Sequence, residues 1–135
     1  MTRITSRFAA VLLALLMSAS WAAAADNFKC AECGMMVDED SRFSARIVEA
    51  KTTLHFCDIG DLLAYLKNKN RPAAGAQVKD YLSSKWIEAS SALFVHAPKR
   101  FTTPMGWSVA AFRDREKAQA YGSPLDFAAM TAALK

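Results

Sequence analysis

Short runs of aromatic and β-branched residues, bounded by turn-forming residues, predict a series of β-strands. The predicted strands are 43–50, 52–57, 77–82, 92–97 and 107–112, with a turn at 86–89. The first two strands should form a hairpin around Glu49-Ala50-Lys51. Each strand is short, which is typical of small antiparallel sheets.

Three helices are predicted between and after these strands. The first begins at Asp58, a residue type that caps helix N-termini, and runs to about Asn68. Asp61 stands three residues after this cap, as the acidic residue of a capping box does. The core-facing stripe of this helix is expected to be Leu62, Leu63 and Leu66.

The other two helices lie near the C-terminus. One is capped at Asp114 and runs through Tyr121, and the last begins at Ser123-Pro124. Its predicted inward-facing residues are Leu125, Ala128, Ala129 and Leu134, with Met130 also placed in the core.

The order of these elements predicts an α+β fold with mostly antiparallel strand pairing. It also fits two related strand–strand–helix units, one in each half of the chain. About 110 residues follow the N-terminal segment, which is enough for one domain with its own core. We therefore expect a single domain over 26–135.

Residues 1–25 have the pattern of a secretory signal peptide. Arg3 and Arg7 form a positive start, an apolar stretch of about ten residues follows, and Ala23-Ala24-Ala25 provides a cleavage site. The apolar stretch is too short to span a bilayer. Cys30 follows Asp26-Asn27-Phe28-Lys29 and so lacks a lipobox. We expect an exported protein without a membrane anchor, periplasmic in a Gram-negative source.

Charge and motifs exclude several function classes. Loss of the signal peptide removes two arginines, so the formal charge falls from +4 to +2, and no basic stripe indicates nucleic-acid binding. There is no GxSxG, no HExxH and no glycine-rich phosphate loop. The sequence thus predicts no catalytic residues, no small-molecule substrate and no enzymatic activity.

The cysteines are the main candidate for chemistry. Cys30, Cys33 and Cys57 make an odd number, and an unpaired cysteine in an oxidising compartment indicates a metal site or a reactive thiol. Cys57 directly precedes a predicted helix, whose N-terminal dipole favours a thiolate. The alternative is a Cys30–Cys33 disulfide with Cys57 as a buried free cysteine.

Methionines lie close to these cysteines in the sequence or stand on a loop. Met35 and Met36 follow the CxxC motif, and Met105 lies on a loop bounded by proline and glycine. Cu(I) accepts thioether ligands, whereas zinc has little use for them. Cys33 and Met35 would share one face of an extended segment and, with Met105, could supply a three-coordinate sulfur site for Cu(I).

Two other uses of the cysteines stay open. The first is a tetrahedral Cys₃His zinc site made by Cys30, Cys33, Cys57 and His55. His55 alternates with Cys57 along a predicted strand, so both side chains would project from the same face. A thiol–disulfide oxidoreductase using Cys30-x-x-Cys33 is the enzymatic alternative. It is disfavoured because no helix start with a good cap follows the motif.

Four motifs, in this order and spacing, make the chain resemble the NosL family. They are Cys33-Gly34-Met35, Phe56-Cys57-Asp58-Ile59-Gly60-Asp61, Trp86-Ile87-Glu88-Ala89 leading to Leu93-Phe94-Val95, and Pro104-Met105-Gly106 leading to Ala111-Phe112. The resemblance runs from about Lys29 to Tyr121. Family members are accessory proteins of nitrous oxide reductase maturation and related exported copper proteins.

The resemblance implies a periplasmic Cu(I) chaperone with a ββα-type core, similar to part of organomercurial lyase. It implies Cys33, Met35 and Met105 as ligands, with Cys30 and Cys57 added in the CxxCGM variant of the family. The partner would be a copper-accepting periplasmic or membrane protein. Family members are commonly lipoproteins, and the absence of a lipobox departs from that pattern.

Overall fold

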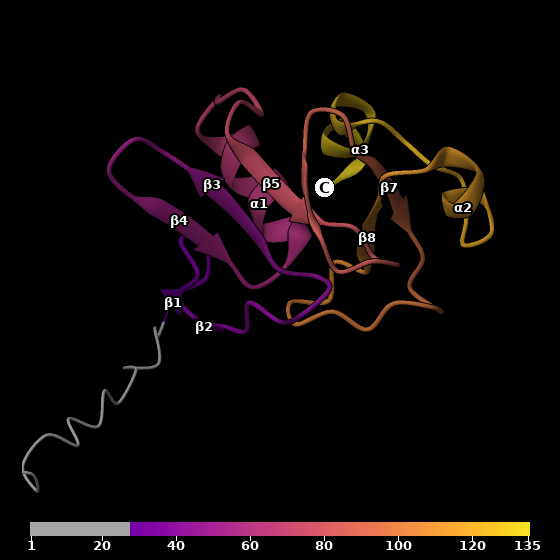
Figure 1. The fold of residues 1–135 in the computed structure, drawn as a ribbon, viewed down its shortest axis with the longest axis horizontal. Helices are drawn as coiled ribbons and strands as arrows, with labels where there is room; N and C mark the ends of the chain where they lie inside the picture. The colour runs from indigo at the N-terminus through magenta and orange to yellow at the C-terminus, as the bar shows by residue number, and fades with distance from the viewer. Residues whose placement is uncertain (1–27) are drawn as a thin grey trace, which may run out of the picture.

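The computed structural model describes residues 28–135, so the predicted signal peptide lies outside the described residues. Its strands are β1 (Phe28–Lys29), β2 (Met36–Val37), β3 (Ala45–Val48), β4 (Thr53–Phe56), β5 (Ala76–Lys79), β6 (Trp86–Glu88), β7 (Leu93–His96) and β8 (Val109–Phe112). Its helices are α1 (Ile59–Asn68), α2 (Arg115–Gln119) and α3 (Phe127–Ala133). Figure 1 shows their arrangement. Within 28–135 no helix has the length and apolar character needed to cross a bilayer.

All the strands pair antiparallel in three small sheets, which confirms the predicted α+β class. The largest has the order β4-β3-β5-β6, and β1-β2 and β7-β8 are two-stranded. The predicted hairpin is β3-β4, in which Ala45 pairs with Phe56. The order strand–strand–helix occurs as β3-β4-α1 and as β7-β8-α2. The two hairpins differ in setting, since only β3-β4 belongs to a larger sheet.

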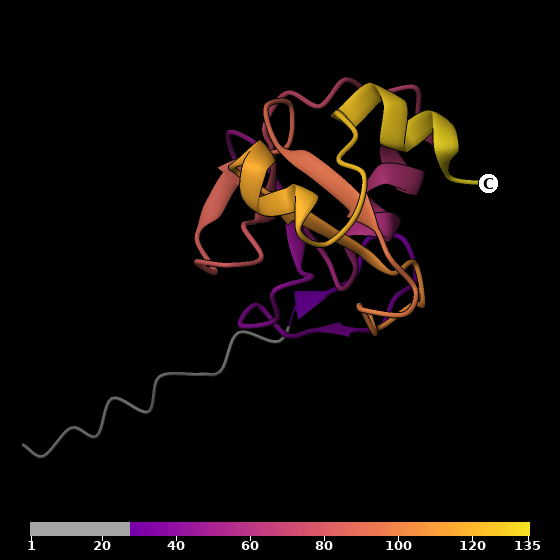
Figure 2. The ribbon, with the colours of Figure 1, turned by 90° about the vertical axis from the view of Figure 1, so that its right-hand side faces the viewer.

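Helix α1 begins and ends as predicted. The Asp58 carboxylate accepts the Gly60 N–H at 3.0 Å and so satisfies one of the free donors at the helix start. Leu62, Leu63 and Leu66 are buried against β3, β4 and β8. Figure 2 shows α3 beside α1, which it also contacts.

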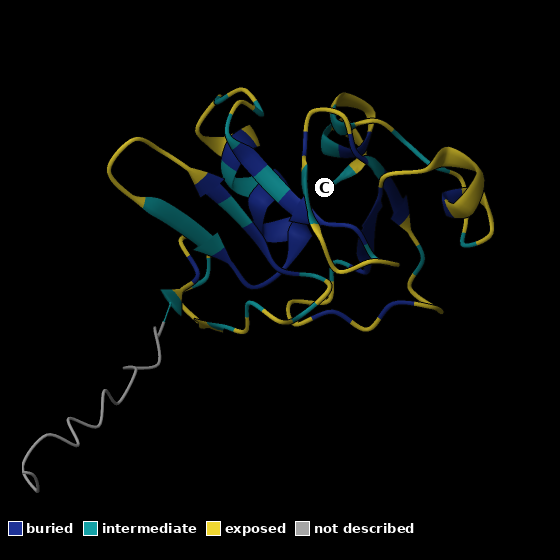
Figure 3. Cartoon of the chain, in the orientation of Figure 1, coloured by how far each residue is buried: buried dark blue, intermediate teal, exposed yellow. Residues whose placement is uncertain are grey.

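Strand β8 is buried on both faces because it separates two groups of core side chains. Val109 and Ala111 belong to the main core with α1, whereas Ala110 and Phe112 face a second, aromatic-rich core. A strand covered on both faces is uniformly apolar instead of alternating. Figure 3 shows buried segments in β3, β5, β7, β8 and α1.

Two predicted elements differ most clearly from the structure. Residues 86–89, expected to be a turn, include strand β6, because Val78 of β5 pairs with Ile87. The last helix starts at Phe127 because Asp126 is its cap and accepts the Ala129 N–H at 2.8 Å.

This shift changes which residues of the last helix face the core. Leu125 lies before α3 and forms a bridge with Phe94. Ala128 and Ala129 are exposed, whereas Met130 is buried as predicted. Leu134 ends the helix as its C-cap and packs on the core, as expected.

Candidate metal centre

A tight hairpin loop carries Cys30 and Cys33 to the end of β4. Strands β1 and β2 close the loop, and the Cys30 N–H donates to the Met35 carbonyl at 2.7 Å. Gly34 has φ +76°, a conformation that favours glycine, and its N–H donates to the Cys30 carbonyl at 2.9 Å. The loop joins β4 through a bridge between Cys30 and His55.

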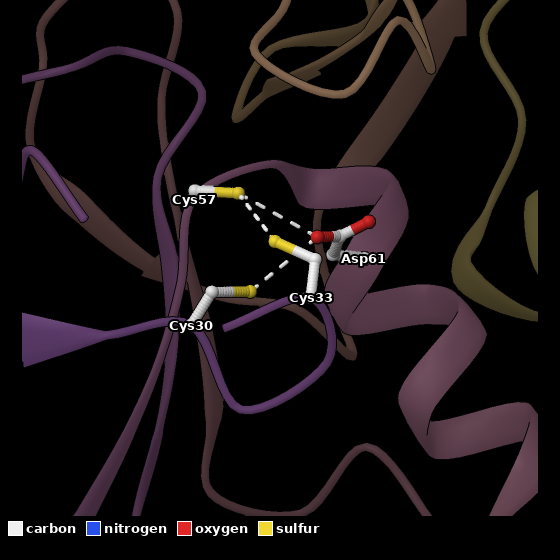
Figure 4. Close-up of side chains that lie close together, drawn as sticks. All are labelled: Cys30, Cys33, Cys57 and Asp61. Carbon is white, nitrogen blue, oxygen red and sulfur yellow. Dashed lines mark hydrogen bonds between the residues drawn. The ribbon is translucent and has the colours of Figure 1, made fainter. Parts of the chain in front are cut away.

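The loop places two thiols beside the start of α1. Cys57 connects β4 to the cap of this helix, and Asp61 lies in its first turn. Four candidate ligand atoms, one each from Cys30, Cys33, Cys57 and Asp61, lie within 4.8 Å of one another. Figure 4 shows these side chains converging from the loop and from α1.

The contacts inside this four-residue cluster are direct. The sulfur atoms of Cys33 and Cys57 are 3.4 Å apart. Asp61 Oδ2 accepts from the Cys30 thiol at 3.3 Å and from the Cys57 thiol at 3.5 Å. Ligands around a four-coordinate metal ion with sulfur bonds of about 2.3 Å lie at comparable separations. The distances within the cluster therefore match those of a site for one metal ion.

Asp61 is a buried carboxylate without a cationic partner. Its exposed fraction is 3%, and neither of the two ion pairs found within 28–135 involves it. Its other oxygen, Oδ1, accepts the indole N–H of Trp107 at 2.7 Å. Buried charges in proteins are normally paired or coordinate metals. Asp61 thus favours occupation of the cluster by a cation.

Burial shifts the acidity of two of the thiols. It raises the pKa of Cys33 and raises the pKa of Cys57 far more strongly. Both are therefore protonated thiols at neutral pH, which agrees with an S–H donor from Cys57 to Asp61. A metal ion must displace these protons to bind thiolates.

The Met105 loop is attached to the same end of α1. Asp58 Oδ2 accepts the Thr103 hydroxyl at 2.6 Å and the Met105 N–H at 2.9 Å. The loop continues to Trp107, whose indole reaches Asp61. Two carboxylates at one helix start therefore hold the loop beside the cluster.

The methionine side chains are more exposed than the cysteines. Met105 is 41% exposed and Met35 is 48% exposed, while Cys30 and Cys57 are buried and Cys33 is half-buried. The expectation that Cys33 and Met35 share a face of an extended segment is wrong, because the loop is a turn at Cys33. The structure brings the three cysteines together and places both thioethers at the surface.

His55 is not part of the cluster, so the predicted Cys₃His set is wrong in its fourth residue. Its ring stacks on Phe28 with centroids 3.8 Å apart. Its Nδ1 lies 3.0 Å from Glu39 Oε1, without the alignment of a hydrogen bond. Asp61 supplies the fourth candidate ligand instead. The available signal was that Asp61 follows Cys57 closely in the sequence, which places an acidic residue in the first helical turn just after a cysteine that precedes the cap.

Comparison with known proteins places the chain in a family. No curated protein and no solved structure matches it. A family model described as NosL matches residues 22–128, which is most of the chain. This family comprises accessory and metal-binding proteins and is generally exported. With its cluster of three cysteines and one aspartate, the chain belongs to the NosL family.

Proposed function

We propose that this protein is an exported Cu(I) chaperone that delivers copper to a periplasmic copper enzyme, such as nitrous oxide reductase, or to a related acceptor. The observation that carries the proposal is the cluster of three thiols around a buried carboxylate without a cationic partner. A cation bound there would offset the cost of burying the Asp61 charge.

The sulfur ligands favour Cu(I) over harder cations. Thiolates and thioethers are soft ligands, and Cu(I) is the metal ion that uses both together. Cys33 is the half-buried thiol of the cluster, and the thioethers of Met35 and Met105 are exposed. We propose Cys33, Met35 and Met105 as primary ligands, with Cys30 and Cys57 as further sulfur donors. The thiolates would supply most of the affinity, and the thioethers would keep the ion exchangeable.

An anaerobic titration of the purified, reduced protein tests this function. Cu(I) is added in the presence of a chromophoric Cu(I) chelator, and Zn²⁺ is titrated in parallel. We expect one Cu(I) per chain, bound tightly enough to compete with the chelator, and clearly weaker Zn²⁺ binding. Tight Zn²⁺ with only loose Cu(I) would contradict the chaperone function.

A structural zinc site is the second candidate, and the four-ligand geometry favours it specifically. Cys30, Cys33, Cys57 and Asp61 are a chemically suitable tetrahedral donor set for zinc. A structural zinc ion supplies folding free energy, so its removal by a chelator should unfold the domain. On the copper proposal, we expect the chelator-treated protein to keep its circular dichroism spectrum and a cooperative thermal transition. Loss of both on chelation would support zinc.

A further inference from the structure

We propose that Cys33 and Cys57, and not the two cysteines of the CxxC motif, form a disulfide when the protein is oxidised, and that this disulfide closes the metal site. The pairing is an inference about the thiols themselves. Only its consequence for copper rests on the proposed function.

The geometry selects this pair. Cys33 Sγ lies 3.4 Å from Cys57 Sγ, and Figure 4 shows the two side chains directed toward each other. Cys30 and Cys57 both donate to Asp61, at 3.3 and 3.5 Å, but the direct sulfur–sulfur contact of the cluster joins Cys57 to Cys33. A disulfide requires sulfur atoms about 2.0 Å apart, so the Cys33–Cys57 pair needs a movement of only about 1.4 Å.

The backbone can provide that movement on one side. Cys33 is half-buried at the tip of the β1–β2 loop, and the neighbouring Gly34 has open space where a Cβ would lie. Cys57 is fixed between β4 and the cap of α1 and is 4% exposed. The loop would therefore move toward the helix.

The difference in exposure between Cys33 and Cys57 also determines which thiol reacts first. A low-molecular-weight disulfide such as oxidised glutathione reaches Cys33 first. After its thiol proton passes to solvent, the Cys33 sulfur attacks one sulfur of the oxidant, the oxidant's S–S bond breaks, and a mixed disulfide forms while the leaving thiolate takes up a proton. The Cys57 thiolate then attacks the Cys33 sulfur of that mixed disulfide and releases the second thiol. The protein loses two protons and two electrons, and the oxidant gains both pairs as two thiols.

Oxidation removes two of the three sulfur donors from the cluster. Of the proposed copper ligands, the Cys30 thiol and the exposed thioethers of Met35 and Met105 remain, so the site keeps one thiol and loses the affinity that the Cys33 and Cys57 thiolates supply. One free thiol per chain, that of Cys30, remains after the pairing. Copper loading would then be confined to the reduced protein.

Peptide mapping of the oxidised protein tests the pairing directly. The reduced, metal-free protein is incubated with oxidised glutathione, its remaining thiols are alkylated, and it is digested with trypsin. Cys30 and Cys33 fall in one tryptic peptide, 30–42, and Cys57 falls in another, 52–67. We expect these two peptides to be cross-linked and to carry one alkyl group. Further cleavage after Glu32 separates Cys30 from Cys33 and should place the alkyl group on Cys30.

Several results would overturn the pairing. They are a disulfide within peptide 30–42, a cross-link through Cys30, alkylation of all three cysteines, or glutathione left on Cys33. The Cys30→Ser variant should still form the cross-link, and Cys57→Ser should not. Both are compared with the original protein by circular dichroism, and the mapping of the original protein stands even if a variant fails to fold.

The closing of the site has a separate readout. We expect the oxidised protein to bind Cu(I) at least 100-fold more weakly than the reduced protein, with recovery after reduction. Equal Cu(I) affinity of the oxidised and reduced protein would show that the disulfide does not close the metal site, but it would not contradict the Cys33–Cys57 pairing. If the reduced protein fails to bind Cu(I), the proposed function fails, but the peptide map still decides the disulfide.

Discussion

The Cys33→Ala variant should lose tight Cu(I) binding altogether. Cys33 touches Cys57 and is the most exposed thiol of the cluster, so its removal takes away the thiolate that an incoming ion reaches first. Loss of residues that merely support a ligand commonly costs 10–100-fold in metal affinity, and loss of a ligand should cost about 100-fold or more. Competition against a chromophoric Cu(I) chelator measures the effect.

The thioether of Met105 should matter less. We expect Met105→Ala to weaken Cu(I) binding by about tenfold, within the range seen when a supporting group is lost. Met36→Ala is the matched control, because Met36 is similarly exposed at 53% but is not a proposed ligand. Unchanged Cu(I) affinity in both the Cys33 and the Met105 variant would refute the ligand assignment.

The Gly60→Ala variant should be strongly destabilised, although alanine usually favours a helix. A Cβ at Gly60 would overlap Cγ of Trp107, so the indole must move. Overpacking costs about 1–3 kcal/mol or more, against a gain of about 1 kcal/mol from helix propensity. The move would also break the bond from Trp107 to Asp61. We expect the free energy of unfolding, measured with urea, to fall by about 2 kcal/mol.

A double-mutant cycle isolates this contact. In a Trp107→Gly background, which removes the Cβ of residue 107 as well as the indole, the extra methyl group at Gly60 meets no side chain of residue 107, so Gly60→Ala should be neutral or slightly stabilising. An equal loss of stability in both backgrounds would show that the close packing of Trp107 on Gly60 is not its cause.

The sequence was sufficient to predict elements that are determined by residues close together in the chain. Helix α1 was predictable from its cap and its leucine spacing, and the β3-β4 hairpin from its residue types. Strand β6 was not, because the short segment Trp86–Glu88 becomes a strand only by pairing with β5. The start of α3 was misplaced because Ser123 and Asp126 are both acceptable caps and tertiary contacts decide between them.

The candidate site was predictable in its sulfur atoms but not in its carboxylate. The capping-box spacing predicted that Asp61 only stabilises the start of its own helix. Its side chain instead contacts Cys30, Cys57 and Trp107, which come from different parts of the sequence. His55 was chosen by strand alternation, yet docking of β1 directs its ring onto Phe28. Both errors arise from contacts between distant segments, which spacing alone does not encode.

The attachment of the Met105 loop to Asp58 links two motions that would otherwise be independent. The same carboxylate caps α1 through Gly60 and holds the Met105 amide, and it is fully buried. Local opening in proteins proceeds in cooperative units, and here one side chain holds both the helix start and the loop. Fraying of the first helical turn and release of the loop are therefore a single event. The loop that carries the Met105 thioether therefore moves together with the first turn of α1 and not independently of it.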